Sequence, residues 1–205
     1  LSNTQKILRN EDIHYALTTF SYSDEIDSVL LVDTSNRSYS YSNNYNISRS
    51  QEGTLIDTMK NMKLSEGQIK WAGTQLPENN LNKERNMITG FREIFDVDSD
   101  TIRGYLIVNV DESYIYNIYK GIHIGDTGII YLLSPDGTII SHPDKSKLGS
   151  LINKSLLSQF VDSAGSITYR ADNGEEMLLI YNKSSDAGFI TLGEVPYREI
   201  MRAAY

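Results

Sequence analysis

The sequence predicts an α+β fold in which two antiparallel β-sheets of five strands each are flanked by helices. The first observation behind this prediction is an order that occurs twice, since each half of the chain runs strand, strand, helix, strand, strand, strand. The second is the short turns between consecutive strands, such as Thr34-Ser35-Asn36 and Asp172-Asn173-Gly174, which join antiparallel neighbours. A chain of 205 residues is long enough for two small lobes, each with its own core.

The first half opens with apolar residues near helical spacing over residues 1–20, which predicts one helix or two in tandem. A second, amphipathic helix is predicted over 54–64, because its apolar residues recur at intervals of three and four. The polar insert 76–85 is expected to be a surface loop. The strands of this half are predicted at 26–33, 37–42, 68–74, 86–95 and 101–110.

The second half is organised around the turn Ser134-Pro135-Asp136-Gly137, in which Pro sets one dihedral angle and Gly supplies a positive one. Before this turn, Asp111 is predicted to begin a short helix that continues over 114–119. After it, a helix is predicted over 151–161, and Pro196 is expected at the first position of a final helix. The strands of this half are predicted at 129–133, 138–140, 166–170, 177–181 and 189–193.

The composition excludes several classes of function. A formal net charge of −8 without a run of Lys or Arg argues against a nucleic-acid partner. The absence of Cys excludes disulfides, thiolate metal sites and a Cys nucleophile. No window is apolar enough to span a bilayer, and no signal peptide opens the chain. The start at Leu1 without Met and the helical run at 197–205 suggest a piece of a longer protein.

One continuous series of signals points to a known family. Gly125-Asp126-Thr127-Gly128 precedes the hairpin, His142-Pro143-Asp144 follows it, and Leu148-Gly149 comes next. This order closely resembles the membrane-proximal lobe of double Cache (dCache) domains, the extracytoplasmic sensor modules of bacterial receptors. The resemblance implies a long N-terminal helix that carries two PAS-like lobes. The implied parts are an N-terminal helical stalk at 1–24, a membrane-distal lobe at 25–120, a membrane-proximal lobe at 121–196 and an exit helix at 197–205.

Within dCache domains, the order from Ile122-His123-Ile124-Gly125 to Val195-Pro196-Tyr197 is most similar to YesM-type sensor histidine kinases of Gram-positive bacteria. The resemblance implies an ectodomain on the extracellular face of the cell membrane, a membrane-anchored homodimer and a kinase part outside this chain. Because family members often accompany carbohydrate uptake systems, it also implies a sugar or a sugar-loaded solute-binding protein as partner. The alternatives are the ectodomain of a chemoreceptor or of a diguanylate cyclase, and a module that docks a solute-binding protein rather than a free small molecule.

We identify four candidate ligand-binding residues in the first half. Trp71, the only Trp, can stack on a sugar or cap an organic ligand, although a core position is the simpler interpretation. The guanidinium of Arg92 can hold a carboxylate or another polar group, but an ion pair with a nearby acid is the simpler interpretation. Alternation places Tyr105 and Asn109 on one face of their strand, free to line a pocket, while the purely apolar face of Leu106, Val108 and Val110 meets the core.

Resemblance also bears on the kind of ligand. Amino-acid-binding dCache domains carry an acidic residue near the position of Asn109, and an Arg two residues before a Trp-Tyr pair. This chain has a neutral amide at Asn109, Ile69 two residues before Trp71, and Ala72 after it. An amide cannot compensate an ammonium charge and Ile cannot bind a carboxylate. We therefore expect an uncharged polar ligand, such as a carbohydrate, rather than an α-amino acid.

The sequence contains no catalytic motif, and we expect neither a cofactor nor a metal in this chain. An enzyme is the weakest alternative, because Gly125-Asp126-Thr127-Gly128 lacks the second copy that an aspartic protease needs. His142 is interpreted as a hydrogen-bonded structural residue, since no paired ligand spacing accompanies it. The alternating acids at 96–100 lack the Gly and terminal Glu of a calcium loop and are interpreted as a solvated turn.

Overall fold

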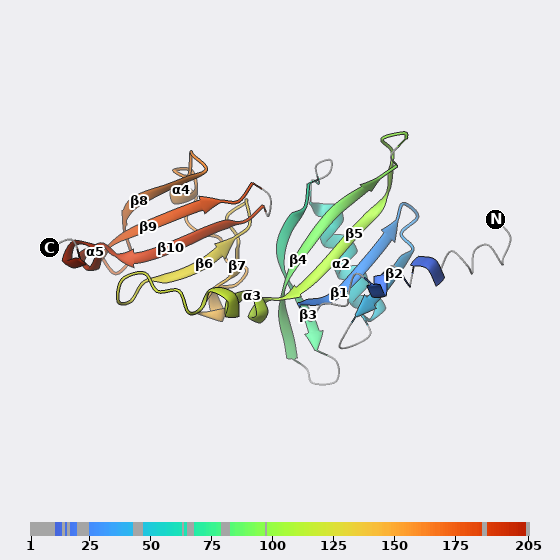
Figure 1. Cartoon of the computed structure of the whole chain (residues 1–205), viewed down its shortest axis with the longest axis horizontal. Helices are drawn as coiled ribbons and strands as arrows, with labels where there is room; N and C mark the ends of the chain where they lie inside the picture. The colour runs from blue at the N-terminus through green and yellow to red at the C-terminus, as the bar shows by residue number, and fades with distance from the viewer. Residues whose placement is uncertain are drawn as a thin grey trace. The chain divides into compact units, whose positions relative to one another are not determined.

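The chain forms two compact units in a computed structural model. The described residues are 11–13, 15, 17–19, 25–42, 47–62, 64, 68–78, 83–96, 98–185 and 188–203. The first unit comprises Leu1–Lys70 and Thr74–Asp111, and the second comprises Trp71–Gly73 and Glu112–Tyr205. Each unit is built on one five-stranded sheet (Figure 1). None of the described helices combines the length and the apolar character needed to span a bilayer.

The sheet of the first unit is antiparallel at every pair for which the register is given, with the strand order β2-β1-β5-β4-β3. Its strands are β1 (Ile26–Asp33), β2 (Ser38–Ser42), β3 (Lys70–Glu78), β4 (Lys83–Phe95) and β5 (Ile102–Asp111). All five were predicted, and the hairpin between β1 and β2 is confirmed. The prediction of a loop over 76–85 is wrong, because β3 and β4 extend into it from both sides. Pro77 is tolerated there since β3 is an edge strand.

One face of this sheet is covered by α2 (Arg49–Asn61). The helix begins earlier than predicted because Ser48 and Gln51 form a capping box: the Ser48 hydroxyl accepts from the Gln51 N–H at 3.2 Å, and the Gln51 side chain accepts from the Ser48 N–H at 2.6 Å. Glu52 accepts hydrogen bonds from Ser38 at 2.7 Å and Ser40 at 2.9 Å, which ties α2 to β2. The sheet face that these two serines share is called the α2 face below.

The opposite face of the first sheet meets helical residues near the N-terminus. Ile13 and Leu17 lie over it, and with the sheet they line an apolar cavity of about 350 Å³. The sheet side of the cavity consists of aliphatic residues, namely Ile26, Val29, Leu31, Ile94, Leu106 and Val108. The residues described between 11 and 19 are helical, while the rest of the predicted N-terminal helix lies outside the described residues.

The second unit repeats the strand order of the first, as β7-β6-β10-β9-β8. Its strands are β6 (Ile129–Leu133), β7 (Ile139–Ser141), β8 (Ala164–Arg170), β9 (Glu176–Lys183) and β10 (Ile190–Pro196). One face carries a core of aromatic and aliphatic side chains, namely Tyr131, Leu133, Ile139, Phe160, Leu179, Tyr181, Ile190 and Leu192. The apolar residues that alternate along these strands therefore all face one core.

Two details of the second unit differ from the predictions. The helix expected over 151–161 is reduced to the single turn α4 (Lys154–Leu157), whose first N–H groups are capped by Asn153. Pro196 is the last residue of β10 rather than the first of a helix, because its partner in the ladder is Met177 and α5 (Tyr197–Ala203) begins after it. A Pro at the very end of a strand removes only one ladder donor.

The helix α3 (Glu112–Tyr119) follows β5 directly and groups with the second unit, whereas the boundary implied by resemblance lies after it, at Lys120. Its first residue, Glu112, is 2% exposed. One carboxylate oxygen accepts from the Ser141 hydroxyl at 2.6 Å, and the other lies 2.7 Å from the ammonium of Lys145 in the 3-10 turn η1 (Lys145–Lys147). Lys145 also lies 3.8 Å from the ring centroid of Tyr116. These contacts attach α3 to β7 and η1.

Replacement of Lys145 by Met should destabilise the second unit by about 2 kcal/mol, because the buried Glu112 loses its cation. This is less than the roughly 3–5 kcal/mol of a fully buried pair, since the Lys145 side chain is 40% exposed to water. Native-state hydrogen exchange of the amides of β6 and β10, two strands of this unit, measures the change. Lys147→Met, in the same turn, is the control, and equal effects of both substitutions would refute the interpretation.

Candidate functional site

Four adjacent strands of the first sheet each contribute one polar side chain to a continuous row on the α2 face. The row consists of Ser28 on β1, Asn109 on β5, Thr89 on β4 and Thr74 on β3, and is called the polar row below. Its alignment follows from strand register, because Asn109 is the pairing partner of both Ser28 and Thr89. Side chains that stand opposite each other in neighbouring strands are close enough to bond directly.

Three hydrogen bonds run along the polar row in one direction. The Thr89 hydroxyl donates to Oδ1 of Asn109 at 2.7 Å, and Nδ2 of Asn109 donates to the Ser28 hydroxyl at 2.9 Å. The hydroxyls of Thr74 and Thr89 lie 2.5 Å apart. Because the single hydroxyl hydrogen of Thr89 is used toward Asn109, Thr74 must be the donor in this last bond. Each bond thus polarises the next.

The polar row is neutral, and three of its four members are fully buried. Ser28, Thr89 and Asn109 each have 0% exposure. Sequence analysis predicted that the face of Asn109 would be free to line a pocket, whereas in this structure packing covers it. Chemically, the row offers hydroxyl and amide groups that can both donate and accept, and the hydrogen bonds described for it include no base that could activate a hydroxyl as a nucleophile. The row is suited to binding, not to catalysis.

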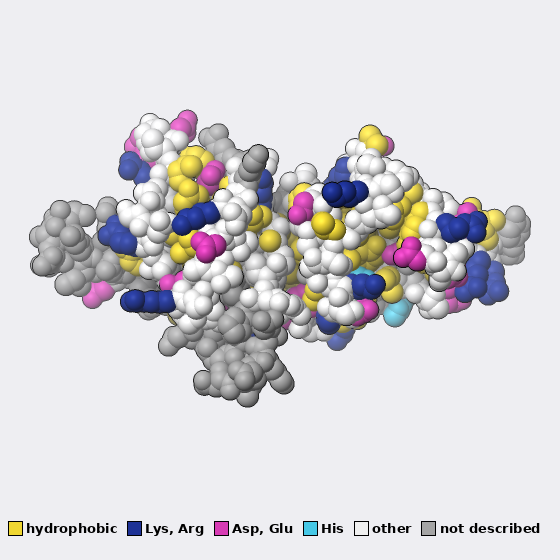
Figure 2. All heavy atoms as spheres, turned by 180° about the vertical axis from the view of Figure 1, so that it is seen from behind, with side chains coloured by type: hydrophobic (Ala, Val, Ile, Leu, Met, Phe, Trp, Pro, Cys, Tyr) yellow, Lys and Arg dark blue, Asp and Glu magenta, His cyan; other side chains and the backbone are white. Residues whose placement is uncertain are grey.

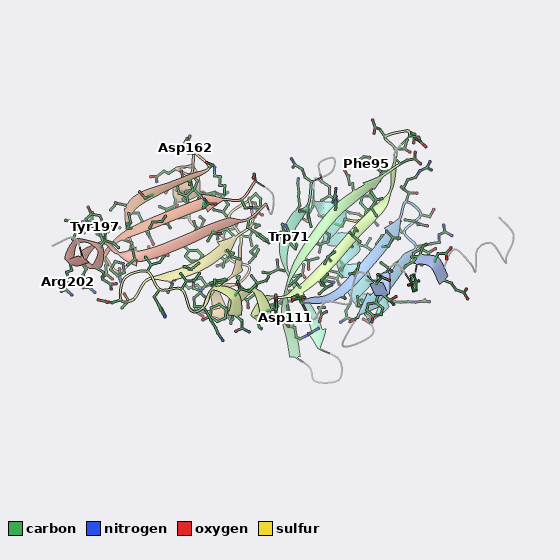
Figure 3. All side chains as sticks on the ribbon, viewed as in Figure 1. Trp71, Phe95, Asp111, Asp162, Tyr197 and Arg202 are labelled. Atoms are coloured by element: carbon green, nitrogen blue, oxygen red, sulfur yellow. The ribbon has the colours of Figure 1, made fainter. Side chains whose placement is uncertain are left out.

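A set of charged residues adjoins the polar row at the end of β5. Arg85 on β4 contacts Asp27 through Nη2 at 2.8 Å and Asp111 through Nη1 at 3.6 Å. The Asp27 side chain is 3% exposed, and it lies where the register of β1 shifts relative to β5. Figure 3 labels Asp111 at the point where β5 passes into α3. The guanidinium of Arg85 thus contacts both carboxylates, and each of these acids beside the polar row has a cationic partner.

The structure brings together two of the four predicted ligand-binding residues. Tyr105 and Asn109 share the α2 face, with Ile107 between them on β5. Arg92 pairs with Leu106 and therefore points to the opposite face, where it is exposed. Arg92 and Asn109 cannot line the same side of the sheet. Whether any of these residues binds a ligand stays a prediction.

Trp71 lies near the start of β3, labelled in Figure 3. Strand alternation turns it to the face opposite Thr74, away from the polar row. It groups with the second unit, where its ring centroid lies 5.0 Å from that of Phe189. Its indole Nε1 is buried and has no hydrogen-bond partner among the described residues. A buried indole N–H without an acceptor is uncommon, and this donor is available to an acceptor that the described residues do not supply.

Sequence reasoning missed Ser28, Thr74 and Thr89. A signal was present for two of them, since Ser28 interrupts the apolar run of β1 and Thr89 follows Ile88 within β4. A single polar residue in a strand does not reveal its neighbours, however. The pairing of β5 with β1 and with β4 shows that these side chains meet, and β1 and β5 are the first and the last strand of the unit in sequence order.

The second unit buries a different set of polar groups. Tyr131 donates to Oε2 of Glu194 at 3.0 Å, and the Tyr169 hydroxyl donates to the other oxygen of that carboxylate. Burial raises the pKa of both phenols. His142 is buried against Tyr131, with ring centroids 5.0 Å apart, and its Nδ1 accepts from the Asp144 N–H at 2.9 Å. Among the described residues, no three His, Asp or Glu side chains gather as metal ligands.

The distribution of surface charge agrees with the absence of basic runs in the sequence. On the face shown in Figure 2, Lys and Arg side chains are interspersed with Asp and Glu. No continuous basic surface is visible on that face that would follow a phosphate backbone.

Replacement of Thr89 by Val should cost about 1–3 kcal/mol of unfolding free energy, because Asn109 loses its donor and Thr74 its acceptor in a fully buried place. Urea unfolding measures the loss. Thr191→Val is the matched control, since Thr191 is an exposed strand residue of β10 and its substitution should stay within about 0.5 kcal/mol. A loss no larger than the control would mean that the row does not stabilise the fold.

The stability of the second unit should fall as the pH decreases below about 6.5, because burial lowers the pKa of His142 below its ordinary value of 6.5. Below this pH the unfolded chain binds a proton at His142 that the folded unit does not bind. The contribution of neutral His142 to the free energy of unfolding is therefore complete above the pKa of the unfolded chain, and it is lost as the pH falls through the pKa of the folded unit. Urea unfolding in steps from about pH 7.5 to about pH 5, the range in which His titrates, measures this loss of stability. His142→Gln should flatten this dependence and His123→Gln, at an exposed position, should not.

Comparison with known proteins supports the repeated architecture. The dCache_1 model of the Cache domain family matches residues 6–204. The search of curated proteins finds no match. Among solved structures, the periplasmic sensory domain of the Campylobacter jejuni chemoreceptor Tlp1 is similar with a TM-score of 0.63 at 17% identity, covering 94% of this chain and 80% of that one.

Two further structures are similar at the level of the fold. The extracellular domain of the putative histidine kinase mmHK1S-Z3 has a TM-score of 0.61 at 14% identity, covering 95% of this chain and 82% of its own. The ligand-binding domain of the Pseudomonas aeruginosa PAO1 amino acid chemoreceptor PctB, in complex with L-Gln, has a TM-score of 0.60 at 15% identity, covering 92% and 76%. Because the family model spans both units and both sheets have the same strand order, this chain belongs to the dCache_1 family of Cache domains.

Proposed function

We propose that this chain is the ligand-sensing domain of a bacterial membrane receptor, located outside the cytoplasmic membrane and without catalytic activity of its own. Membership in the Cache family supports the sensing role, and the similar structures include a periplasmic sensory domain and an extracellular domain. The observation that carries the proposal is the polar row, a buried and uncharged set of hydrogen-bonding groups in the first unit. Such groups fix the orientation of a small molecule in an otherwise apolar site.

The ligand of the first unit is a small, uncharged, polar molecule, with a carbohydrate as first candidate. Sugar hydroxyls both donate and accept, as do the groups of the polar row. Because the row is buried in this structure, a ligand that bonds to Asn109 must first displace the residues that cover it. Binding therefore selects a conformation different from this one, and the shift in population is the signal. Typical coupling of this kind amounts to about 1–3 kcal/mol.

An α-amino acid is the second candidate, favoured by the similar structures of PctB with L-Gln and of Mlp24 with asparagine. Such a ligand needs an anion for its ammonium group and a cation for its carboxylate. In the first unit, Asp27, Arg85 and Asp111 are the charged groups beside the polar row, and they contact one another. An amino acid would have to replace these ion pairs by its own, at the cost of breaking buried contacts.

The receptor itself is proposed to be a YesM-type sensor histidine kinase that acts as a homodimer, with a solute-binding protein as an alternative partner to a free ligand. A chemoreceptor and a diguanylate cyclase are the other candidates for the output. The similar structures come from both chemoreceptors and histidine kinases. The sequence that follows this domain in the full receptor would discriminate the three.

A thermal-shift screen of the chain against sugars, amino acids and organic acids tests the proposal. A ligand at a hundred times its dissociation constant should stabilise the folded state by roughly 2.7 kcal/mol. The shift should disappear in Asn109→Ala, compared with the ligand-free melting temperature of that variant. It should persist in Asn182→Ala, an exposed strand residue of the second unit.

The outcomes separate the candidates. A sugar hit that depends on Asn109 supports the proposed ligand, and an amino-acid hit lost on Arg85→Met supports the second candidate. A hit that persists in both variants would place the ligand elsewhere and contradict the assignment of the first unit. Silence across the panel, followed by binding of a purified sugar-loaded solute-binding protein, would replace the free ligand by that partner.

A further inference from the structure

The last helix of the second unit is bound to the loop 125–128 through one buried carboxylate. Glu199 on α5 is 9% exposed. Its Oε2 accepts from the backbone N–H groups of Asp126 at 2.7 Å and Thr127 at 3.0 Å, and its Oε1 accepts from the Thr127 hydroxyl at 2.5 Å. All three donors belong to the loop 125–128, which is separated from Glu199 by most of the sequence of the unit.

The loop 125–128 is shaped to receive this carboxylate. The Gly128 N–H bonds to the Ile124 carbonyl at 2.9 Å, which closes the loop and turns two consecutive N–H groups toward the same oxygen. Consecutive N–H groups that converge in this way form an anion-binding nest. Gly125 has a φ of +63°, and a Cβ on it would lie 2.6 Å from Oε2 of Glu199. Only glycine allows the carboxylate to come this close.

The electrostatic surroundings favour the ionised carboxylate. Hydrogen bonds from Thr127 lower the pKa of Glu199, with a further contribution from the neighbouring Arg198. Arg198 itself contacts Glu175, the residue directly before β9, at 3.1 Å. Hydrogen bonds to a charged acceptor are about twice as strong as neutral ones. The contacts of Glu199 therefore outweigh the exposed ion pair of Arg198 in holding α5.

We propose that Glu199 and the loop 125–128 form a latch that makes α5 move with the second sheet as one rigid piece, and that α5 detaches from an otherwise intact unit when the latch is broken. If the chain is a sensor domain as proposed above, α5 is the element that transmits a displacement of the sheet out of the domain. Only this role of α5, and not the latch itself, rests on the proposed function. Figure 3 labels Tyr197 and Arg202 on this helix. The latch is a short, direct connection, since α5 follows β10 and the loop precedes β6, the neighbour of β10 in the sheet.

Hydrogen exchange of the ligand-free chain tests the latch from both of its sides. Glu199→Leu removes the carboxylate, and Gly125→Ala obstructs its place in the loop while Glu199 stays. Both variants should accelerate the exchange of the α5 amides by roughly ten- to hundredfold, and the amides of β6 and β10 should keep their protection. Arg198→Leu is the matched control on the same helix and should change the exchange of α5 by less than about threefold.

A spin label provides a second readout. Because the chain contains no cysteine, Met201→Cys gives a single labelling site on α5, at a side chain that is 39% exposed. The nitroxide should become more mobile in combination with Glu199→Leu and stay unchanged with Arg198→Leu. Unchanged hydrogen exchange of α5 in both latch variants, together with unchanged nitroxide mobility in Glu199→Leu, would overturn the proposal. Loss of protection throughout the unit would also overturn it, because Glu199 would then stabilise the whole unit rather than α5 alone. None of these results depends on a ligand, so they stand whether or not the ligand screen succeeds.

Discussion

The pairing of β5 with β1 on one side and β4 on the other is the constraint on which the first unit depends. It sets Asn109 opposite both Ser28 and Thr89. A shift of register by one residue would turn Asn109 to the aliphatic face that includes Val108 and would leave its amide without partners. The hydrogen bonds of the polar row therefore define which register is native, in addition to satisfying buried groups.

The two units use their polar groups in different ways. In the first unit, neutral hydroxyls and an amide bond along a single row. In the second, Glu112, Glu194 and Glu199 each accept from donors on other elements, so that carboxylates connect α3 to β7, β10 to β6 and β8, and α5 to a loop. Charge-assisted contacts of this kind resist separation more than neutral ones.

Much of the fold could be predicted because its signals are local. The strands 26–33 and 129–133 have the predicted bounds, since apolar runs ended by turn residues are sufficient to define them. The extension of β3 and β4 into the segment 76–85 and the place of Pro196 in β10 were missed because each depends on pairing with a neighbouring strand, which a local pattern does not specify. The candidate site was accessible only in part for the same reason: Asn109 could be singled out in its own strand, but its partners follow from the register of β5 with β1 and β4.

The identical strand order of the two units has a consequence for how such a chain can change. In each sheet the first and last strands are neighbours and antiparallel, so that Ile26 lies beside Val110 and Ile129 beside Glu194. The chain therefore enters and leaves each unit at the same end of its sheet. The chain between these two points begins and ends at the same place. It can therefore be lengthened, shortened or exchanged without altering the distance between the point of entry and the point of exit. An architecture of this kind can diversify its binding surface while the connections on either side keep their geometry.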